Sequence, residues 1–329
     1  MTVPASSPAG VALGSALHAL AADALALGVG AALPTNAQYT ARYQLAAGTI
    51  QRALTFLAER EALVTTSHGH RGRRIQGLSV GTLWQLGGLA PVRLVLPPEG
   101  PEETTQLQEA LAQGLADLGI PHTVIHLRGA LRRLAAVRAG DYDICVTSAG
   151  AAERALADAP DERLGRLTRT LAKGTYYAPG SLVCVRRAAS DPTAHRTVAI
   201  DPDSPDHAAL TRAEFPLAAG ATRYVEMPFT SVPAAVLRGE IEVGIWHRQE
   251  SIIPLELAGL DTTPMQRPEA HLVWERASRA VLTGWVGRPE LASVLSALEL
   301  GSGEAPGPEH GSTDAGAARP RRVTGRRAG

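Results

Sequence analysis

The sequence predicts an α+β winged helix-turn-helix unit joined to a bilobed α/β domain. Three observations predict it: a helical N-terminal third that ends in a basic hairpin, a following region in which strands alternate with helices, and a phrase that recurs once in each half of that region. We expect the first unit at 11–80, the second at 90–295, and a disordered basic tail at 301–329. A chain of 329 residues is long enough for two domains with buried cores.

The charge of the chain sums to zero but is unevenly distributed. Residues 1–80 carry six basic and three acidic side chains, residues 81–300 carry 21 and 26, and residues 301–329 carry five and three. This pattern argues against nucleic-acid binding along the whole molecule and permits it in the N-terminal third. Cys145 and Cys184 lie in apolar runs, which indicates buried thiols in a reducing compartment rather than a disulfide framework.

The first helix is predicted from apolar residues at helical spacing before Pro34. They are Leu13, Leu17, Leu20, Ala24 and Leu27. A secretory signal peptide is the alternative, but no basic residue precedes Arg42, and His18 and Asp23 interrupt the apolar run. We therefore expect a cytoplasmic helix. No uninterrupted run of 18 apolar residues occurs, so we do not expect a membrane-spanning helix.

Two further helices are predicted at about 36–43 and 47–60, joined by a tight connection at 44–46. Thr35 or Asn36 is the expected N-cap of the former. Two short helices joined by such a turn have helix-turn-helix geometry, in which the second helix enters the major groove. There Gln51 can pair with adenine, and Arg52 with guanine or phosphate. We expect a polar outer face on this helix, formed by Thr49, Gln51, Arg52, Thr55, Glu59 and Arg60.

A basic hairpin follows, with strands at 63–66 and 73–76 around a turn at 67–72. Its arginines and histidines suit a wing that contacts the sugar-phosphate backbone. A small helical bundle with a solvated basic hairpin is the alternative. The candidate DNA-binding residues are Thr35, Gly48, Thr49, Gln51, Arg52, His70, Arg71, Arg73 and Arg74.

Three short motifs in this region carry a family resemblance. They are Leu33-Pro34-Thr35, Gly48-Thr49-Ile50-Gln51 and Gly69-His70-Arg71-Gly72. About 45 residues around them resemble the winged helix-turn-helix of GntR-type bacterial regulators, in particular the YhfZ-type branch. Ala46 and Ala47 depart from it, since Ser and Arg usually precede the Gly-Thr pair, and the turn reads GHRG rather than RGH followed by Gly. The resemblance therefore supports the fold and says little about operator preference.

Strands and helices alternate from residue 91, which predicts parallel, doubly wound sheets. Strands are expected at 92–96, 122–127, 143–147, 181–185, 197–200, 222–226 and 241–246, with helices at 102–118, 129–139, 205–215 and 230–239. Residues 270–286 are interpreted as a strand that returns to the first lobe. The phrases RAGDYD and LRGEIE form a weak internal repeat, one per lobe. This region resembles type 2 periplasmic-binding-protein-like sensors and the YhfZ-type C-terminal domain.

In such a fold a ligand lies in the crevice beyond the carboxyl ends of the strands, near helix N-termini. The candidate effector-binding residues are Glu99, Ser148, Asp201, Ser204, Thr230, Ser231, Trp246 and His247. The serines and the threonine are better explained as helix caps than as ligand contacts, and Trp246 is equally explained as packing between the lobes. Asp201, Asp203 and Asp206 could hold a hard cation, but the intervening prolines favour a capping turn.

Catalytic motifs are not found: the sequence has no Gly-x-Ser-x-Gly elbow, Walker loop or dinucleotide fingerprint. We expect no enzyme activity, no cofactor and no metal, although enzymes also use the bilobed fold. The function expected is that of a cytoplasmic, ligand-responsive transcriptional regulator. Its partners would be double-stranded operator DNA, a small-molecule effector of unknown identity and a second copy of the chain, with no membrane. An exported solute-binding protein and an enzyme are the alternatives.

Overall fold

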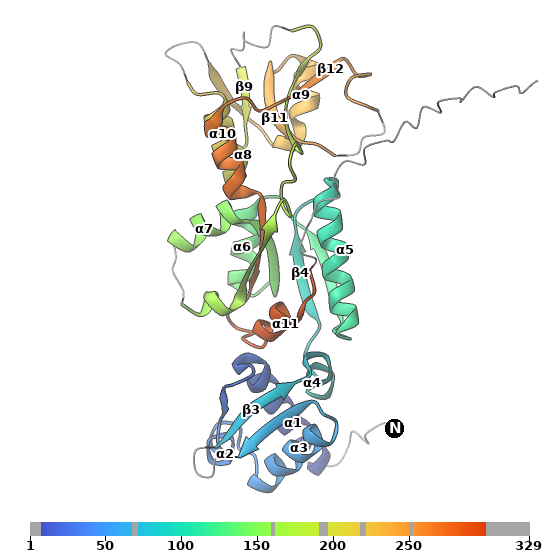
Figure 1. Ribbon diagram of the computed structural model, residues 1–329, viewed down its shortest axis with the longest axis vertical. Coiled ribbons are helices and arrows are strands. Elements are labelled where there is room, and N and C mark those ends of the chain that lie inside the picture. Colours follow the sequence, from blue (N-terminus) through green and yellow to red (C-terminus); the bar gives the residue numbers. More distant parts are fainter. Residues whose placement is uncertain are drawn as a thin grey trace, which may run out of the picture.

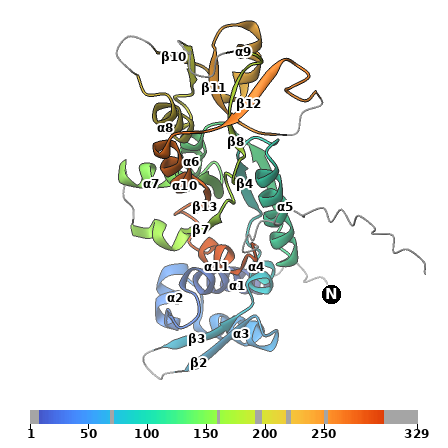
Figure 2. The ribbon, with the colours of Figure 1, turned by 45° about the horizontal axis from the view of Figure 1, so that its top comes forward.

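The computed structural model describes residues 8–67, 72–158, 162–190, 197–217, 222–249 and 253–300. Three bodies follow one another along the long axis of the molecule (Figure 1). The N-terminal unit, residues 8–78, lies at one end. The first lobe is in the middle and the second lobe forms the other end, an order that the turned view in Figure 2 also shows.

The N-terminal unit consists of three helices and a small antiparallel sheet of order β1-β3-β2. Its elements are α1 (Pro8–Leu27), β1 (Ala32–Leu33), α2 (Asn36–Tyr43), α3 (Ala47–Glu59), β2 (Leu63–Ser67) and β3 (Arg73–Leu78). The two hairpin strands are β2 and β3, with a register shift between Val64 and Thr65. Strand β1 was not predicted; it adds a third strand by pairing Leu33 with Arg73.

Local signals fix the ends of α2 and α3. Thr35 and Gln38 form a reciprocal capping box at the start of α2. Gln44 ends α2 in the left-handed region, at φ 55°, which turns the chain sharply into α3. Ala46 occupies the N-cap of α3 and supplies no side-chain hydrogen bond. The start of α3 is thus less well capped than that of α2.

Helix α1 is the one described helix that is long and apolar enough to cross a membrane, by length and composition alone. The segment Ala9–Leu27 has a mean hydropathy of 1.5, so the expectation that no such segment exists was too strict. Its inward face, which includes Ala16, Leu20 and Leu25, is buried in the core of the molecule. Packing against α3 explains the apolar character of this face without a membrane.

The first lobe has a five-stranded mixed sheet of order β5-β4-β6-β13-β7. Its strands are β4 (Val92–Leu96), β5 (His122–His126), β6 (Ile144–Ser148), β7 (Thr168–Lys173) and β13 (Arg279–Gly284). Strand β4 runs parallel to β5 and β6, and β13 runs antiparallel to β6 and β7. The helices of this lobe are α5 (Glu102–Asp117), α6 (Ala130–Ala139) and α7 (Ala149–Asp158), followed by the short 3-10 helix η2 (Glu162–Leu167).

The second lobe has another five-stranded mixed sheet, of order β10-β9-β11-β8-β12. Its strands are β8 (Leu182–Arg187), β9 (Thr197–Ile200), β10 (Arg223–Glu226), β11 (Val243–His247) and β12 (Leu260–Pro264). Strand β8 runs antiparallel to both β11 and β12. The helices are α8 (Pro205–Glu214), the 3-10 helix η3 (Phe229–Ser231), α9 (Val232–Arg238) and α10 (Pro268–Ala277).

The two sheets have the same topology. In each, the lobe's own strands stand in the order second, first, third and fourth, and one strand that arrives from the other lobe is inserted before the fourth. That crossing strand is β13 in the first lobe and β8 in the second. The chain therefore crosses between the lobes twice, and the domain has the expected bilobed, type 2 periplasmic-binding-protein-like architecture.

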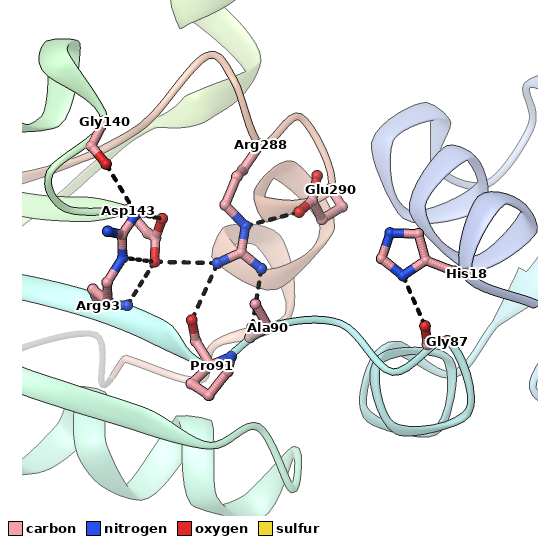
Figure 3. Close-up of polar contacts among 9 residues, drawn as sticks. All are labelled: His18, Gly87, Ala90, Pro91, Arg93, Gly140, Asp143, Arg288 and Glu290. Carbon is pink, nitrogen blue, oxygen red and sulfur yellow. Dashed lines mark hydrogen bonds and ion pairs between the residues drawn. The ribbon is translucent and has the colours of Figure 1, made fainter. Parts of the chain in front are cut away.

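The N-terminal unit and the first lobe are joined through α4 (Val80–Leu86) and α11 (Leu291–Ala297). Arg288 lies at the centre of a polar network beside this junction (Figure 3). Its guanidinium forms ion pairs with Asp143 at 3.1 Å and Glu290 at 2.9 Å, and donates to the carbonyl oxygens of Ala90 and Pro91. His18 of α1 contacts the Gly87 carbonyl oxygen at 2.9 Å, at the end of α4.

Several predicted elements need correction. Residues 270–286 were expected to be one strand, but α10 continues to Ala277 and only β13 returns to the first lobe. Six elements after the hairpin were not predicted: α4, α7, η2, β7, β12 and α11. The two cysteines are free and buried, as expected, and burial raises the pKa of each thiol to about 12. Residues 68–71 of the turn expected at 67–72, and the tail expected at 301–329, lie outside the described residues.

Candidate functional site

A crevice between the two lobes has an interior volume of about 50 Å³ and opens to solvent. Loops that follow β4 and β5 and the crossover to β8 line it from the first-lobe side, and loops that follow β9, β10 and β11 line it from the second. Of the eight predicted effector residues, six line this crevice: Glu99, Asp201, Ser204, Thr230, Trp246 and His247. The rule that ligands bind at the carboxyl ends of strands therefore identified residues that are far apart in the sequence and line one crevice in the structure.

The other two predicted residues lie elsewhere. Ser148 is buried behind the crevice, where its hydroxyl oxygen accepts a hydrogen bond from the Ala151 N–H and so caps α7. Ser231 stands at the start of α9 and is not among the lining residues. Ser204 and Ser231 both occupy N-cap positions without a side-chain capping bond, so the alternative explanation as caps applies only to Ser148.

Arg128, which sequence reasoning missed, ties the lobes together at the crevice. Its guanidinium donates to Asp201 at 2.9 Å and to Asp203 at 3.1 Å, across the gap between the loop after β5 and the loop after β9. Asp201 also accepts hydrogen bonds from the backbone N–H groups of Asp203 and Phe229, each at 3.0 Å. Arg132 adds a second contact to Asp203, at 2.9 Å. Asp201 and Asp203 therefore pair with arginine side chains, and Asp201 also holds the backbone of a turn.

Glu103 and His247 form a second, buried link between the lobes. The His247 Nε2 lies 2.9 Å from the Glu103 Oε1, and both side chains are less than a tenth exposed. Burial raises the pKa of Glu103, but the hydrogen bonds from His247 and the Ala178 N–H outweigh it, so the pKa falls to about 2. Glu103 is therefore a carboxylate at neutral pH. It was not predicted, because it lies inside the first turn of α5 rather than in a loop.

Asp206 is a third buried acid, on the first turn of α8 and at the wall of the crevice. Its carboxyl group accepts hydrogen bonds from the hydroxyls of Ser148 and Tyr177, which belong to the first lobe and to the crossover segment. Burial dominates over these hydrogen bonds and raises the pKa of Asp206 to about 6. A Cβ at Gly150 would approach the Asp206 Oδ1 to 2.9 Å, so a larger residue there would require this carboxyl group to shift.

Aromatic rings form much of the interior around these acids. Tyr177 packs edge-on against Tyr176 at 4.8 Å and against His247 at 5.0 Å, measured between ring centroids. His207 stacks on Phe229 with centroids 4.0 Å apart. Burial lowers the pKa of His207 to about 3, so its ring is neutral.

Arg133 is buried beneath the crevice floor, with only 2% of its surface exposed. Its guanidinium donates to the carbonyl oxygens of Val146 and Leu127 and to the Tyr176 hydroxyl, at 2.7–2.9 Å. This arginine holds α6, β6 and the crossover segment in one arrangement. Within the described ranges, no group of three or more His, Cys, Asp and Glu side chains is placed to hold a metal ion.

The N-terminal unit carries a separate polar face, which we define as Gly48, Gln51, Arg52 and Arg73. Gly48, Gln51 and Arg52 are exposed on the first half of α3, and Arg73 is half-buried at the start of β3. The Arg73 Nη2 donates to the Gln51 Oε1 at 3.1 Å, so the base of the hairpin contacts α3 directly.

Two of the remaining predicted DNA-binding residues, Thr49 and Arg74, point away from this face, whereas Thr35 lines a groove together with Arg73. Thr49 was expected on the outer face but is buried, because it lies four residues before Ala53 on the inward side of α3. Arg74 points to the opposite side of the hairpin from Arg73, as alternation along a strand requires, and donates to the Gly30 carbonyl oxygen at 2.6 Å. Thr35 uses its hydroxyl to cap α2. His70 and Arg71 lie outside the described residues.

Comparison with solved structures gives similar folds at low identity. YhfZ from Shigella flexneri is 24% identical over 66% of this chain and 88% of its own, with a TM-score of 0.47. The aliphatic sulphonate binding protein SsuA from Escherichia coli is 15% identical over 64% and 71%, with a TM-score of 0.43. A full-length OxyR variant from Pseudomonas aeruginosa is 10% identical over 87% and 98%, with a TM-score of 0.40. Nothing about function follows from likenesses of this degree.

Comparison of the sequence itself is more specific. No curated protein sequence matches the chain. The model of the YhfZ C-terminal domain matches residues 80–299, which is well over half of the chain and includes both lobes. The chain therefore belongs to the family of proteins that carry the YhfZ C-terminal domain.

Proposed function

We propose that this protein is a cytoplasmic transcriptional regulator in which a winged helix-turn-helix binds operator DNA and the interlobe crevice binds a small-molecule effector. The observation that carries the proposal is the contact between Arg73 and Gln51, which joins the hairpin and α3 into one polar face at the end of the molecule far from the second lobe. A recognition helix and a wing must act on the same DNA segment, and this contact holds them together.

The chemistry of the polar face supports contact with DNA. Gln51 presents an amide that can pair with an adenine edge, and Arg52 presents a guanidinium one residue further along the exposed side of α3. Gly48 at the helix start permits close approach of the backbone, since nothing lies within 4 Å of the position of its absent side chain. Arg73 then supplies positive charge beside the groove edge.

Contacts between the N-terminal unit and the first lobe support coupling between the two sites. The Ser293 hydroxyl on α11 donates to the Leu25 carbonyl oxygen, and the Arg166 guanidinium donates at 2.7 Å to the Leu27 carbonyl oxygen. Since α11 directly follows the crossing strand β13, movement between the lobes reaches α1 through a short, packed segment. In a homodimer, lobe closure would shift the spacing of the two polar faces and thus the affinity for paired half-sites.

Salt-dependent DNA binding tests this proposal. The full chain is titrated onto fragments of its own genome at several salt concentrations, and the sequence-preferring fragments are then used for variants. We expect a complex whose log K falls linearly with log salt, with a slope that reflects the number of phosphates contacted. Absence of any preferred fragment at low salt would contradict the regulatory function.

An exported solute-binding protein is the second candidate, because α1 has the length and hydropathy of a signal sequence. The two functions predict different mature proteins. Mass spectrometry of the native N-terminus would show residues 1–37 retained in a regulator and removed in an exported protein. The burial of Ala16, Leu20 and Leu25 in the core favours retention.

A further inference from the structure

Five formally charged side chains line the crevice, and the acids outnumber the bases. Glu99, Asp201 and Asp206 are acidic, and Arg128 and Arg133 are basic. Glu103 adds a further carboxylate behind His247. Charged groups in a low-dielectric crevice are stable only when they are paired and hydrogen-bonded. A crevice acid that has no positively charged partner in the protein is therefore a candidate site for a cationic ligand.

Both arginines are already engaged by the protein. Arg128 uses both terminal nitrogens on Asp201 and Asp203. Arg133 uses all three of its nitrogens on backbone carbonyls and the Tyr176 hydroxyl. An anionic ligand would have to displace Asp201 from Arg128 and leave that buried carboxylate without its partner.

Asp206 is the crevice acid that has no ion pair among the described residues, since Glu99 pairs with His126 and Asp201 with Arg128. Among the described residues, no arginine or lysine is within ion-pair distance of its carboxyl group, whereas Asp143 and Asp201 each have such a partner. Its hydrogen bonds come from two neutral hydroxyls, those of Ser148 and Tyr177. Hydroxyls satisfy oxygen lone pairs but do not neutralise a charge, and Arg133 and Arg154 act on Asp206 only from beyond ion-pair distance, so an ionised Asp206 is only partly compensated.

The crevice walls near Asp206 are aromatic. Tyr177, Phe229 and Trp246 all line the same space as this carboxyl group. Aromatic faces attract organic cations, most strongly where water is excluded. A bare metal ion, in contrast, needs a set of oxygen or nitrogen ligands, and no such set is present in the described part of the chain.

We propose that the effector is a small organic cation, such as an alkylammonium compound, whose positive nitrogen pairs with Asp206 between aromatic walls. This inference rests on the proposed function, because it takes the crevice as the effector site. Binding places a positive charge beside Asp206 on α8 of the second lobe and against Tyr177 of the crossover segment between the lobes. The cation would thus stabilise the closed arrangement of the lobes.

Matched probes test the sign of the charge. The full chain, without DNA, is titrated by calorimetry and thermal shift at pH 7.5 with butylammonium, 1,4-diaminobutane and tetramethylammonium, and in parallel with butan-1-ol and butanoate. We expect at least one of the cations to bind and to raise the melting temperature, with butanol and butanoate having no effect. Stabilisation by butanoate, or by none of the cations, would overturn the proposal.

A variant pair tests the residue. Asp206→Asn retains an acceptor for the Ser148 and Tyr177 hydroxyls but removes the charge, so cation affinity should fall at least tenfold. Glu153→Gln is the control, because Glu153 is an exposed acid on the opposite side of Asp206, in a groove outside the crevice. It should change affinity less than twofold. Equal binding by Asp206→Asn and the parent protein would exclude Asp206 as the counter-ion.

The pH dependence provides a second readout. Since burial raises the pKa of Asp206 to about 6, lowering the pH from 7.5 to 5 should weaken cation binding about tenfold. The charged groups that face Asp206 are Arg133 on α6 and Arg154 on α7, with Arg276 of α10 beyond in the outer groove.

Neighbouring histidines need a separate control. His207 stays neutral in this range because burial lowers its pKa to about 3. His247 is paired with Glu103. Cation binding by Glu103→Gln is therefore measured over the same pH range, to identify any contribution of that pair. A tenfold change that persists in Glu103→Gln and disappears in Asp206→Asn supports the proposal. The reverse pattern overturns it. Since no DNA is present, these results do not depend on whether the N-terminal unit binds an operator.

Discussion

The imidazole of His247, the last residue of β11, lies 2.9 Å from the carboxylate of Glu103 in the first turn of α5. The two residues are 144 positions apart and belong to different lobes. Together with Arg128 and its two aspartates, this pair links the two lobes across the crevice. The stability of the closed form therefore depends on the protonation of Glu103.

We expect the contribution of Glu103 to be lost in acid. Its pKa is lowered from 4.5 to about 2 in the folded protein, so its stabilising effect is complete above pH 4.5 and disappears as the pH falls through 2. Urea unfolding of the parent protein and Glu103→Gln should differ at pH 6 and converge across this window. A difference that is constant with pH would contradict the assignment of Glu103 as a carboxylate.

Ionisation of Asp206 should destabilise the ligand-free protein, whereas ionisation of Glu103 stabilises it. Its pKa is raised from 3.8 to about 6, so the folded state holds the proton more tightly than the unfolded state and loses stability as the pH rises through this window. A pKa difference of this size corresponds to about 3 kcal/mol. Asp206→Asn should therefore be more stable than the parent at pH 8 by up to this amount, and similar to it at pH 3.5. Urea unfolding at the two pH values measures this.

Removal of Arg288 should destabilise the junction between the N-terminal unit and the first lobe. Asp143 is fully buried and would keep only Arg93 as its cationic partner. Loss of one partner from a buried ion pair costs about 3 kcal/mol, so Arg288→Ala should lower the free energy of unfolding by about this amount. Arg276→Ala, which removes an exposed arginine on α10, should change it by less than about 0.5 kcal/mol. Similar losses for the two variants would show that the network contributes little.

The N-terminus of α3 offers a stabilising substitution. Ala46 occupies the N-cap with an extended backbone and no side-chain hydrogen bond. Ala46→Ser should supply this bond and raise the free energy of unfolding by about 1 kcal/mol. Ala58→Ser, on the exposed side of the same helix, is the control and should lower it slightly. Thermal unfolding measures both effects.

The two arginines of β3 should affect DNA binding differently. Arg73 contacts Gln51 on the polar face, whereas Arg74 points away from it toward the Gly30 carbonyl oxygen. Arg73→Ala should weaken binding to all sequences and make the salt slope shallower by about 1, while Gln51→Ala should cost about 1–3 kcal/mol at one base position. Arg74→Ala should leave the slope unchanged. If Arg73→Ala and Arg74→Ala weaken DNA binding equally, the DNA-contacting surface extends beyond the polar face defined by Gly48, Gln51, Arg52 and Arg73.

The fold was predictable wherever apolar residues recur at helical or strand spacing along the sequence. The helices α2 and α3 and the strand β9 were placed within a residue or two, because caps and apolar periodicity define them. Strands β7 and β12 were missed, since their sequences TRTLAK and LDTTP are polar edge strands with few buried positions. Helix α10 was interpreted as a strand because Leu272, Val273 and Trp274 form an apolar run, although Pro268 signals a helix start.

The crevice was predictable only where a strand ends in a loop. Asp201 and Thr230 follow strands and His247 ends one, so all three were found by that rule. Asp206 lies within a helix, and Tyr177 lies in the crossover between lobes, where no periodicity points inward. Arg128 and Asp203 are in the loops where ligands are expected, but their pairing depends on how the lobes face each other, which is a property of tertiary structure.

Helix α11, the last described element, packs against α1, the first. A cut between β3 and α4 would therefore separate two sequence segments without separating two folding units. The N-terminal fragment would expose the side of α1 that α4 and α11 cover, and the C-terminal fragment would expose the matching side of α11. Because α1 packs against α11, truncated versions of this protein should aggregate. In the intact chain, the N-terminal unit and α11 should unfold together as one cooperative unit.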